Sequence, residues 1–403
     1  MQLRLALRNV FRNRRRTAFS LAVIIVGTSI FLFLLGFIGE ALNSTKRSLA
    51  CETGAVQVGD ERLFENTAGG YEYLIPPGLR AKVVEIVERQ PGVLGVTWEL
   101  NFGGLVGDET GSTLILGRGV VPCNCVQEYE CLVTDGDELS EDDSRETILG
   151  ARLAAKLGVG PGDRINIATG TVSGNFNAAT VNVIGTLTYS LETIEEQLGL
   201  FPVAFVQRLL KTNGVERILI GLADLDEAGR FAEALQKTLD EAGIPFVTRT
   251  WEELNTSYES LSTFYTAFSG LAGIAVFALV FFSVVEVLTL SFLERTREIG
   301  TLRAIGTSRA RIFRTFLLEG ILLGLIGAVL GTLLGTLVAT TFNLIGFEWT
   351  PPGAAIPQAL RLTVDLSTIL IPLVTAILAT LTSALYPAWK SSRQRIVEAL
   401  QSV

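Results

Sequence analysis

Residues 260–285 read Ser260-Leu-Ser-Thr-Phe-Tyr-Thr-Ala-Phe-Ser-Gly-Leu-Ala-Gly-Ile-Ala-Val-Phe-Ala-Leu-Val-Phe-Phe-Ser-Val-Val285 and carry no charged side chain. A helix needs about 20 apolar residues to cross the hydrocarbon core of a bilayer. Buried helices of globular proteins rarely run that long without a charge on any face. This stretch therefore predicts a transmembrane helix, which we extend over residues 260–293 because the residues after Glu286 are again uncharged.

Three further stretches have the same character, at residues 17–39, 320–344 and 366–389. Across the 403 residues, 48 % are hydrophobic and only 18 % are charged, whereas soluble chains carry about 25 % charged residues. The sequence thus predicts an integral membrane α-helical protein with four transmembrane helices. An α+β extracytoplasmic domain is expected at residues 40–259, inserted between the first and second of these helices.

The distribution of positive charge predicts the orientation, because cytoplasmic loops are rich in Lys and Arg. Residues 1–16 hold six arginines and no acid, and residues 294–314 hold six arginines against two glutamates. The tail at residues 390–403 is also basic, whereas residues 40–259 hold 17 Lys/Arg and 34 Asp/Glu, a net charge of −17. We therefore expect a multi-pass protein of the plasma (cell inner) membrane with both termini cytoplasmic, and a short outer loop at residues 345–365.

Residues 1–16 are expected to form a cytoplasmic amphipathic helix. Arg4, Arg8 and Arg12 recur every four residues, and apolar side chains lie on the other side. Such a helix lies in the headgroup plane of a membrane. The alternative is a basic flank that serves only the orientation of the first span.

Strand and helix patterns alternate in the outer segment, which indicates an α+β domain and suggests two lobes. Helices are predicted over residues 78–89, 145–157 and 224–242, and the run from Arg217 through Thr248 resembles a βαβ unit. Helical spacing also begins at Trp251 and continues into the second span. If unbroken to Glu298, this helix has 48 residues and a length of about 70 Å, more than the 40–45 Å or so of a bilayer, so we expect a stalk from about residue 251.

Several classes of function are excluded by what the chain lacks. It contains no histidine, which excludes Ser-His-Asp and Cys-His catalysis and any histidine-ligated metal site. Its net charge of −8 disfavours nucleic acid as a partner of the whole chain. We predict no catalytic residue, no cofactor-binding residue and no metal site.

Glycines and cysteines form two further patterns. The third span carries glycines at spacings of three and four, which would let another helix of the same subunit or of a partner approach closely; they are Gly320, Gly324, Gly327, Gly331 and Gly335. The cysteines all lie in the outer segment, at Cys51, Cys123, Cys125 and Cys131. Two disulfides are the favoured interpretation outside the cytoplasm, and a three-cysteine metal site is the alternative.

The stretch Leu293-Glu-Arg-Thr-Arg-Glu-Ile-Gly-Thr-Leu-Arg-Ala-Ile-Gly306 follows the second span. Its leucines and isoleucines offer apolar anchors, and its arginines and glutamates offer a polar rim, a composition that suits docking of a soluble partner. A merely solvated loop is the alternative. We name residues 294–314 the coupling segment.

This stretch resembles the signature of FtsX-like permeases, the membrane subunits of MacB-type (type VII) ABC transporters. The matching residues are Glu294, Arg295, Arg297, Glu298, Ile299, Gly300, Leu302, Arg303, Ala304, Ile305 and Gly306. Further similar stretches lie at residues 6–17, 148–163 and 387–400, and the order of one span, a large outer domain and three spans is also similar.

The resemblance implies a division of labour between subunits. Two permeases would pair as a homodimer or heterodimer, and separate ABC ATPase subunits would bind ATP–Mg and dock on the coupling segment. The chain itself has no Gly-x-x-x-x-Gly-Lys-Ser/Thr loop for phosphates, so we expect it not to be an enzyme and to bind no cofactor.

The resemblance leaves the cargo open. The expected function is extrusion or release of a lipid-linked or hydrophobic cargo such as a lipoprotein, and a periplasmic carrier or adaptor is a further expected partner. The alternatives are peptide or drug efflux in a tripartite system and signalling to cell-wall hydrolases.

One residue departs from the family pattern. Eight residues before Glu294, where the family commonly has asparagine, this chain has Glu286. An intramembrane acid is costly unless it is paired, protonated or near water. Glu286 would either face a dimer seam or polar cavity, or lie among lipid headgroups because the bilayer ends near Val285.

Overall fold

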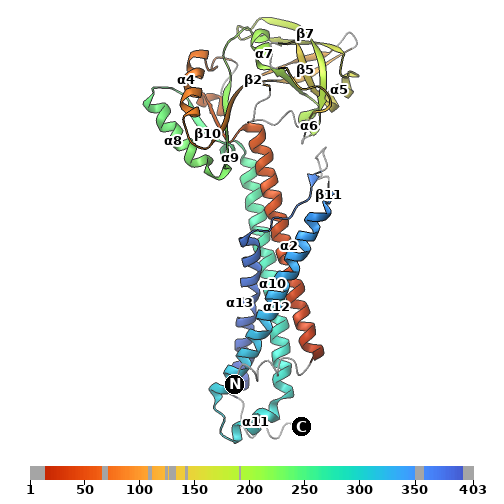
Figure 1. The fold of residues 1–403 in the computed structure, drawn as a ribbon, viewed down its shortest axis with the longest axis vertical. Coiled ribbons are helices and arrows are strands. Elements are labelled where there is room, and N and C mark those ends of the chain that lie inside the picture. Colours follow the sequence, from red (N-terminus) through yellow and green to blue (C-terminus); the bar gives the residue numbers. More distant parts are fainter. Residues whose placement is uncertain are drawn as a thin grey trace. The chain divides into compact units, whose positions relative to one another are not determined.

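The structure is a computed structural model and describes residues 14–65, 71–107, 111–122, 126, 133–140, 144–189, 192–349 and 358–393. The chain divides into two compact units, each traced in Figure 1. The membrane unit comprises Met1–Asn43, Leu261–Phe347 and Ala359–Val403, and the outer unit comprises Ser44–Ser260 and Glu348–Gln358. The expected amphipathic helix lies almost wholly outside the described residues, as does most of the basic tail.

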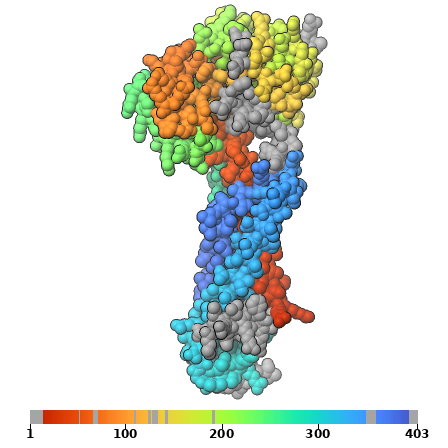
Figure 2. Space-filling view, viewed as in Figure 1, coloured from red at the N-terminus to blue at the C-terminus, as the bar shows by residue number. Residues whose placement is uncertain are grey.

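Long apolar helices form the membrane unit. They are α2 (Arg14–Thr53), α10 (Thr256–Glu294), α12 (Arg309–Ile345) and α13 (Leu366–Ser392). Within the described part of the chain, these four helices are long and apolar enough to cross a membrane, which confirms the predicted fold class. Helices α12 and α13 pack side by side, and their blue surfaces adjoin in Figure 2.

The helices extend further than the apolar runs on which they were predicted. Helix α2 continues past residue 39 and ends at Thr53, because the next residue, Gly54, adopts a φ of +71° that favours glycine. Helix α12 begins at Arg309, where the Ser308 side chain accepts a hydrogen bond from the backbone N–H of Arg311. Charged residues that flank the apolar runs therefore do not end these two helices, because the capping residues lie further along the chain.

The expected unbroken helix from Trp251 to Glu298 is wrong. Residues Trp251–Leu254 form the short helix α9, which starts in a capping box between Thr250 and Glu253. Asn255 then leaves helical geometry, with φ −118° and ψ 70°, and its side-chain amide donates to the backbone oxygen of Trp251. Helix α10 therefore has 39 residues, a length of about 58 Å.

The first lobe of the outer unit is a sheet in the order β10-β1-β9-β2, with helices α4 and α8 packed on it. The elements are β1 (Val56–Gly59), α4 (Pro77–Glu88), β2 (Val93–Gly107), β9 (Arg217–Leu222), α8 (Ala228–Glu241) and β10 (Val247–Thr250). Strand β1 pairs antiparallel with both β9 and β10. The predicted βαβ unit is thus split, because β1 lies between its two parallel strands.

Strand β2 continues into a second lobe, where β2, β3, β8, β5, β7 and β6 pair in a closed ring. Its strands are β3 (Ser112–Val120), β5 (Glu146–Gly150), β6 (Arg164–Gly170), β7 (Phe176–Leu187) and β8 (Leu198–Pro202), with β4 (Val133–Gly136) at the edge beside β7. Helix α7 (Val203–Leu210) packs against several of these strands. The α+β prediction for the outer segment is confirmed.

The helix predicted over residues 145–157 is only half right. Residues Glu146–Gly150 form strand β5, and the helix α5 is confined to Ala151–Leu157. Thr147, Ile148 and Leu149 are buried between β7 and β8, so sheet pairing overrides the weak helical spacing of this segment. Tertiary contacts decide whether such a short apolar run forms a strand or a helix.

The remaining described elements are short. They are α3 (Glu61–Phe64), α6 (Glu192–Glu195), the 3₁₀ turn η2 (Leu225–Glu227), α11 (Thr296–Ala304), β11 (Glu348–Trp349) and β12 (Gln358–Ala359).

Candidate functional site

The coupling segment folds as a short helix between two long ones. Helix α11 (Thr296–Ala304) starts after Arg295, whose φ of −107° breaks the path of α10. It ends two residues before Gly306, which has a φ of +98°. A non-glycine residue at that φ would be strained. The two turns hold α11 as a separate element with one face toward the membrane helices.

The apolar residues of this segment divide into two groups. Ile299 is 5 % exposed and packs in a buried cluster with Phe292 of α10 and Ile312 of α12. Leu302 is 51 % exposed and Ile305 is 79 % exposed. Ile299 therefore fixes α11 to the membrane helices. Of the four predicted anchors, Leu293, Leu302 and Ile305 are exposed and Ile299 is buried.

Ion pairs hold the base of the segment. The Arg295 guanidinium donates to Glu319 of α12 at 3.1 Å, and the two side chains are only 11 % and 4 % exposed. A buried pair adds little net stability, but removal of one partner leaves a buried charge. Arg16 Nη2 also contacts Glu294 Oε1 at 2.6 Å, which ties the first turns of α2 to the end of α10.

Other charged positions lie at the surface of α11. Arg303 Nη1 donates to the backbone oxygen of Ser392 on α13 at 3.4 Å. Arg297 and Glu298 have exposed side chains, and Gly300 is buried. Of the motif residues, Ile299, Gly300 and Arg295 thus serve the attachment of α11, while Arg297, Glu298, Leu302 and Ile305 form its outward surface.

The glycine stripe of α12 packs within the same subunit. A Cβ added at Gly324 would overlap the Thr380 side chain of α13, and one at Gly320 would lie 2.5 Å from Ala384 Cβ. Gly327, Gly331 and Gly335 instead face α2, against Ile24, Thr28 and Ser29. The stripe is therefore a seam that lets α12 approach two helices of its own chain.

Glu286 and the cysteines are placed less completely. Glu286 lies on the exposed side of α10, away from the buried residues Val284 and Leu288. Cys123, Cys125 and Cys131 lie outside the described residues, and Cys51 belongs to α2 without a described side chain. The disulfide prediction accordingly stays a prediction.

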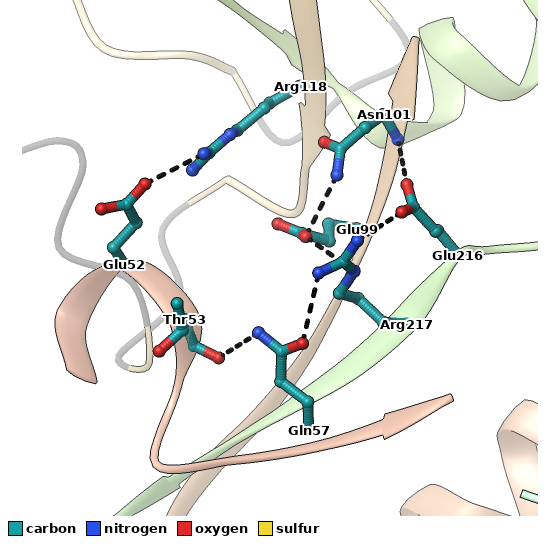
Figure 3. Close-up of polar contacts among 8 residues, drawn as sticks. All are labelled: Glu52, Thr53, Gln57, Glu99, Asn101, Arg118, Glu216 and Arg217. Carbon is teal, nitrogen blue, oxygen red and sulfur yellow. Dashed lines mark hydrogen bonds and ion pairs between the residues drawn. The ribbon is translucent and has the colours of Figure 1, made fainter. Parts of the chain in front are cut away.

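A polar cluster in the outer unit joins the end of α2 to the sheet (Figure 3). Arg118 of β3 donates to Glu52 of α2 at 3.0 Å. Next to it, Gln57 donates to the backbone oxygen of Thr53 at 2.7 Å and accepts from Arg217 of β9 at 3.3 Å. The last turn of α2 is therefore bound to strands of both lobes.

Arg217 is the centre of this cluster. It pairs with Glu216 and, at 3.3 Å, with Glu99 of β2. Burial lowers the pKa of Arg217, but the two carboxylates outweigh burial and raise the pKa above its ordinary value. Asn101 completes the set, since its backbone N–H donates to Glu216 and its side-chain amide donates to Glu99, both at 3.2 Å. Each of the three carboxylates of the cluster therefore pairs with one of its two arginines.

An open cleft of about 460 Å³ lies beside this cluster in the outer unit. Its polar wall includes Asn101, Arg118 and Glu216, and its apolar wall includes Phe102 and Leu116. A cleft of this size matches the range of small-ligand sites, about 300–1,000 Å³.

Sequence reasoning missed the cluster and the partner of Arg295. Glu99 lies within β2 and Arg217 begins the apolar strand β9, and a buried charge requires a partner. That signal indicates that a pair exists but not which residues form it, because Glu99 and Arg217 are far apart in the chain. Glu319 directly precedes an apolar run, and its position in the sequence does not indicate that Arg295 is its partner.

Comparisons with known proteins add to this geometry. The family model described as FtsX-like permease C-terminal matches residues 270–396, and the model described as MacB-like periplasmic core domain matches residues 17–238. The chain is 25 % identical over 271 residues to the lipoprotein-releasing system transmembrane protein LolC of two Xylella fastidiosa strains, 9a5c and Temecula1. That match covers 63 % of this chain and 64 % of each relative, so it spans less than two thirds of their length.

Solved structures were also found. One is the periplasmic region of MacB from Actinobacillus actinomycetemcomitans, with 12 % identity, a TM-score of 0.38, and coverage of 51 % of this chain and 92 % of that one. Another is the extracellular domain of the ABC-type transporter YknZ from Gram-positive bacteria, with 17 % identity, a TM-score of 0.33, and coverage of 44 % and 97 %.

Proposed function

The chain belongs to the family of MacB/FtsX-type ABC transporter permeases, and from that premise we propose that it transmits ATP-driven motion to its outer domain. A separate ATPase, which binds ATP–Mg, docks on the coupling segment, and a second permease completes the pair. Both termini and the coupling segment face the cytoplasm, as the arginine distribution favours. A cysteine placed at exposed Glu233 should then react with an impermeant label from outside intact cells; reaction only after lysis would contradict this orientation.

One observation carries the proposal: α11 presents Leu302 and Ile305 outward while buried Ile299 and the Arg295–Glu319 pair fix it to the membrane helices. Because α11 is fixed to the membrane helices, a partner that binds α11 and moves will also move those helices. Exposed apolar side chains beside a charged rim are typical of protein interfaces. A loop that only connected two helices would not require exposed apolar side chains next to a charged rim.

Helix α2 offers a route for that motion to the outer unit. Its residues up to Asn43 belong to the membrane unit and its residues from Ser44 belong to the outer unit. The helix has no glycine or proline between Glu40 and Thr53, so no residue in that stretch favours a hinge. Its last turn is bound by Arg118 through Glu52.

We propose a lipid-linked or hydrophobic cargo, such as a lipoprotein. Support comes from the LolC proteins, which their names describe as parts of a lipoprotein-releasing system and which this chain resembles at 25 % identity. A periplasmic carrier or adaptor would then accept the cargo.

The experiment is reconstitution of the chain and its co-purifying ATPase in proteoliposomes. ATP should drive release of a fluorescent acylated protein, and an ATPase unable to hydrolyse ATP should abolish it. The matched control is the same protein without its acyl chains, which should not be released. ATP-dependent movement of the non-acylated protein or of a drug would favour efflux instead, and failure to co-purify any ATPase would refute the coupling proposal.

A further inference from the structure

The apolar face of α13 ends in a compact group of aromatic and cationic side chains. The 20 residues from Leu366 to Leu385 carry no charge and span about 30 Å as a helix, which matches the hydrocarbon core of a bilayer. Exposed apolar side chains recur along this span, among them Leu370, Val374, Leu378 and Leu381. The side chains that follow Leu385 therefore lie at the level of the lipid headgroups.

Four exposed side chains form this group, which we call the interfacial patch: Tyr386, Trp389, Lys390 and Arg393. Their spacing of three and four residues places them on one face of the helix end. Tyr386 is 55 % exposed and Trp389 is 49 % exposed. Tyrosine and tryptophan are enriched where a membrane meets water, because each combines an apolar ring with a polar tip. The patch thus has the composition of a membrane interface.

The two cations of the patch lean back toward the membrane. Lys390 Nζ lies 5.9 Å from the centre of the Tyr386 ring, and Arg393 Cζ lies 4.7 Å from the centre of the Trp389 ring. Side chains of a helix point toward its N-terminus, which at this end of α13 is the direction of the hydrocarbon core. The two positive charges are therefore held beside the aromatic rings, at the headgroup level.

The patch carries an excess of positive charge. Among the residues that the structure describes, no carboxylate pairs with Lys390 or Arg393. The last carbonyl groups of a helix together carry about half a negative charge, and one of those of α13, the Ser392 oxygen, already accepts from Arg303 at 3.4 Å. More than one positive charge remains, so the complementary group is an anion.

We propose that the interfacial patch binds the headgroup of an anionic phospholipid. The phosphate contacts Lys390 and Arg393, and the acyl chains lie along the exposed apolar face of α13. Basic side chains at the membrane surface are typical of anionic lipid recognition. A zwitterionic headgroup brings its own ammonium group, which the two cations repel, and a soluble phosphate gains nothing from the apolar face. Lipid binding here requires only that α13 crosses a bilayer, so it is independent of the proposed transport function.

Trp389 reports on the patch directly, because it is the one of the four tryptophans that lies in a membrane helix. The full chain is placed in phosphatidylcholine nanodiscs that contain phosphatidylglycerol brominated near the headgroup end of its acyl chains. Bromine quenches nearby tryptophan, and the quenching that disappears in Trp389→Phe belongs to the patch. Compared with the same mole fraction of brominated phosphatidylcholine, phosphatidylglycerol should be enriched at Trp389 by about tenfold or more, which corresponds to 1.4 kcal/mol or more.

Two double variants separate a site from the total charge of the chain. Lys390→Gln with Arg393→Gln removes both cations of the patch and should bring the enrichment within twofold of no preference. The matched control is Arg309→Gln with Arg311→Gln, which removes two exposed cations from the first turn of α12. Those side chains lean toward the N-terminus of α12, away from the membrane, so this variant should keep the enrichment. Melting temperatures show that both variants are folded.

Four results would overturn lipid binding at the patch. The first, which needs no charge variant, is equal quenching of Trp389 by the two brominated lipids. The second is an absence of quenching by either lipid, which would place Trp389 against protein. The third is an equal loss of enrichment in both double variants at unchanged melting temperature, which would make the preference an effect of total charge. The fourth is displacement of brominated phosphatidylglycerol by glycerol 3-phosphate, which would make the patch a site for soluble phosphate.

Discussion

Replacement of Leu302 and Ile305 by serine tests the coupling proposal most directly. Full burial of a leucine or isoleucine side chain contributes about 1.5–3 kcal/mol. Since Ile305 is 79 % exposed and Leu302 is 51 % exposed, an ATPase that covers both would gain about 2–4 kcal/mol from them. The double variant should therefore bind the ATPase about 30- to 700-fold more weakly, measured by interferometry on nanodiscs and by stimulated ATP hydrolysis.

Two control variants separate docking from folding. Leu94→Ser removes a similarly exposed leucine from the outer unit and should leave ATPase affinity unchanged. Ile299→Ala opens a cavity in the buried cluster, so it should lower stability by about 2–5 kcal/mol without removing a docking contact. If the double serine variant keeps its ATPase affinity within twofold, or if Leu94→Ser weakens it equally, the docking surface is elsewhere.

Three further substitutions probe the packing and electrostatics. Gly324→Ala should lower the unfolding free energy by about 1–3 kcal/mol in detergent, because its Cβ overlaps Thr380; an unchanged melting temperature would show that α12 and α13 pack loosely. Arg295→Met should lower the free energy of unfolding by about 3–5 kcal/mol, because it leaves the Glu319 carboxylate buried without its partner. Adding Glu319→Gln should recover part of the lost melting temperature. If the losses of the two single variants simply add in the double variant, the two residues do not interact. Burial favours a raised pKa for Glu146, but hydrogen bonds from neighbouring serines lower it below its ordinary value. The contribution of Glu146 to the free energy of unfolding is thus present above about pH 4.5 and lost as pH falls through the folded pKa. In a plot of stability against pH, Glu146→Gln should therefore lose less stability on the acid side than the unmodified chain. An unaltered acid side would refute this.

The sequence predicts the membrane helices because lipid imposes a local rule, a long run without charge. Helix ends follow a different rule, the position of caps. Ser308 and Gly54 set the ends of α12 and α2, at Arg309 and Thr53, well beyond the apolar runs of residues 320–344 and 17–39. Asn255 interrupts a pattern whose spacing alone looks continuous. Local capping chemistry could have corrected the first two boundaries, since serine before a helix and glycine after it are readable signals.

The motif could not predict that Ile299 is buried while Leu302 and Ile305 are exposed. A step of three residues falls about 60° short of a full helical turn, so Leu302 is rotated away from Ile299, and Ile305 lies just past the last residue of α11. Which of them is buried depends on where Phe292 and Ile312 lie, and those come from two other helices. The polar cluster has the same origin, because pairing of β2 with β9 brings Glu99 next to Arg217.

Arg118 of β3 lines the outer cleft and also pairs with Glu52 at the end of α2. Lys46 pairs with Asp226 at the surface of the outer unit, and exposed pairs of this kind contribute little, about 0–1 kcal/mol. The Glu52–Arg118 pair is three-quarters buried and is the stronger tie between α2 and the second lobe. Arg118 also lines the cleft, so a molecule that accepts a hydrogen bond from its guanidinium changes the contact of Arg118 with Glu52. Coupling between two sites is reciprocal: a ligand that alters the hold of Arg118 on α2 is itself bound with a different affinity when α2 moves.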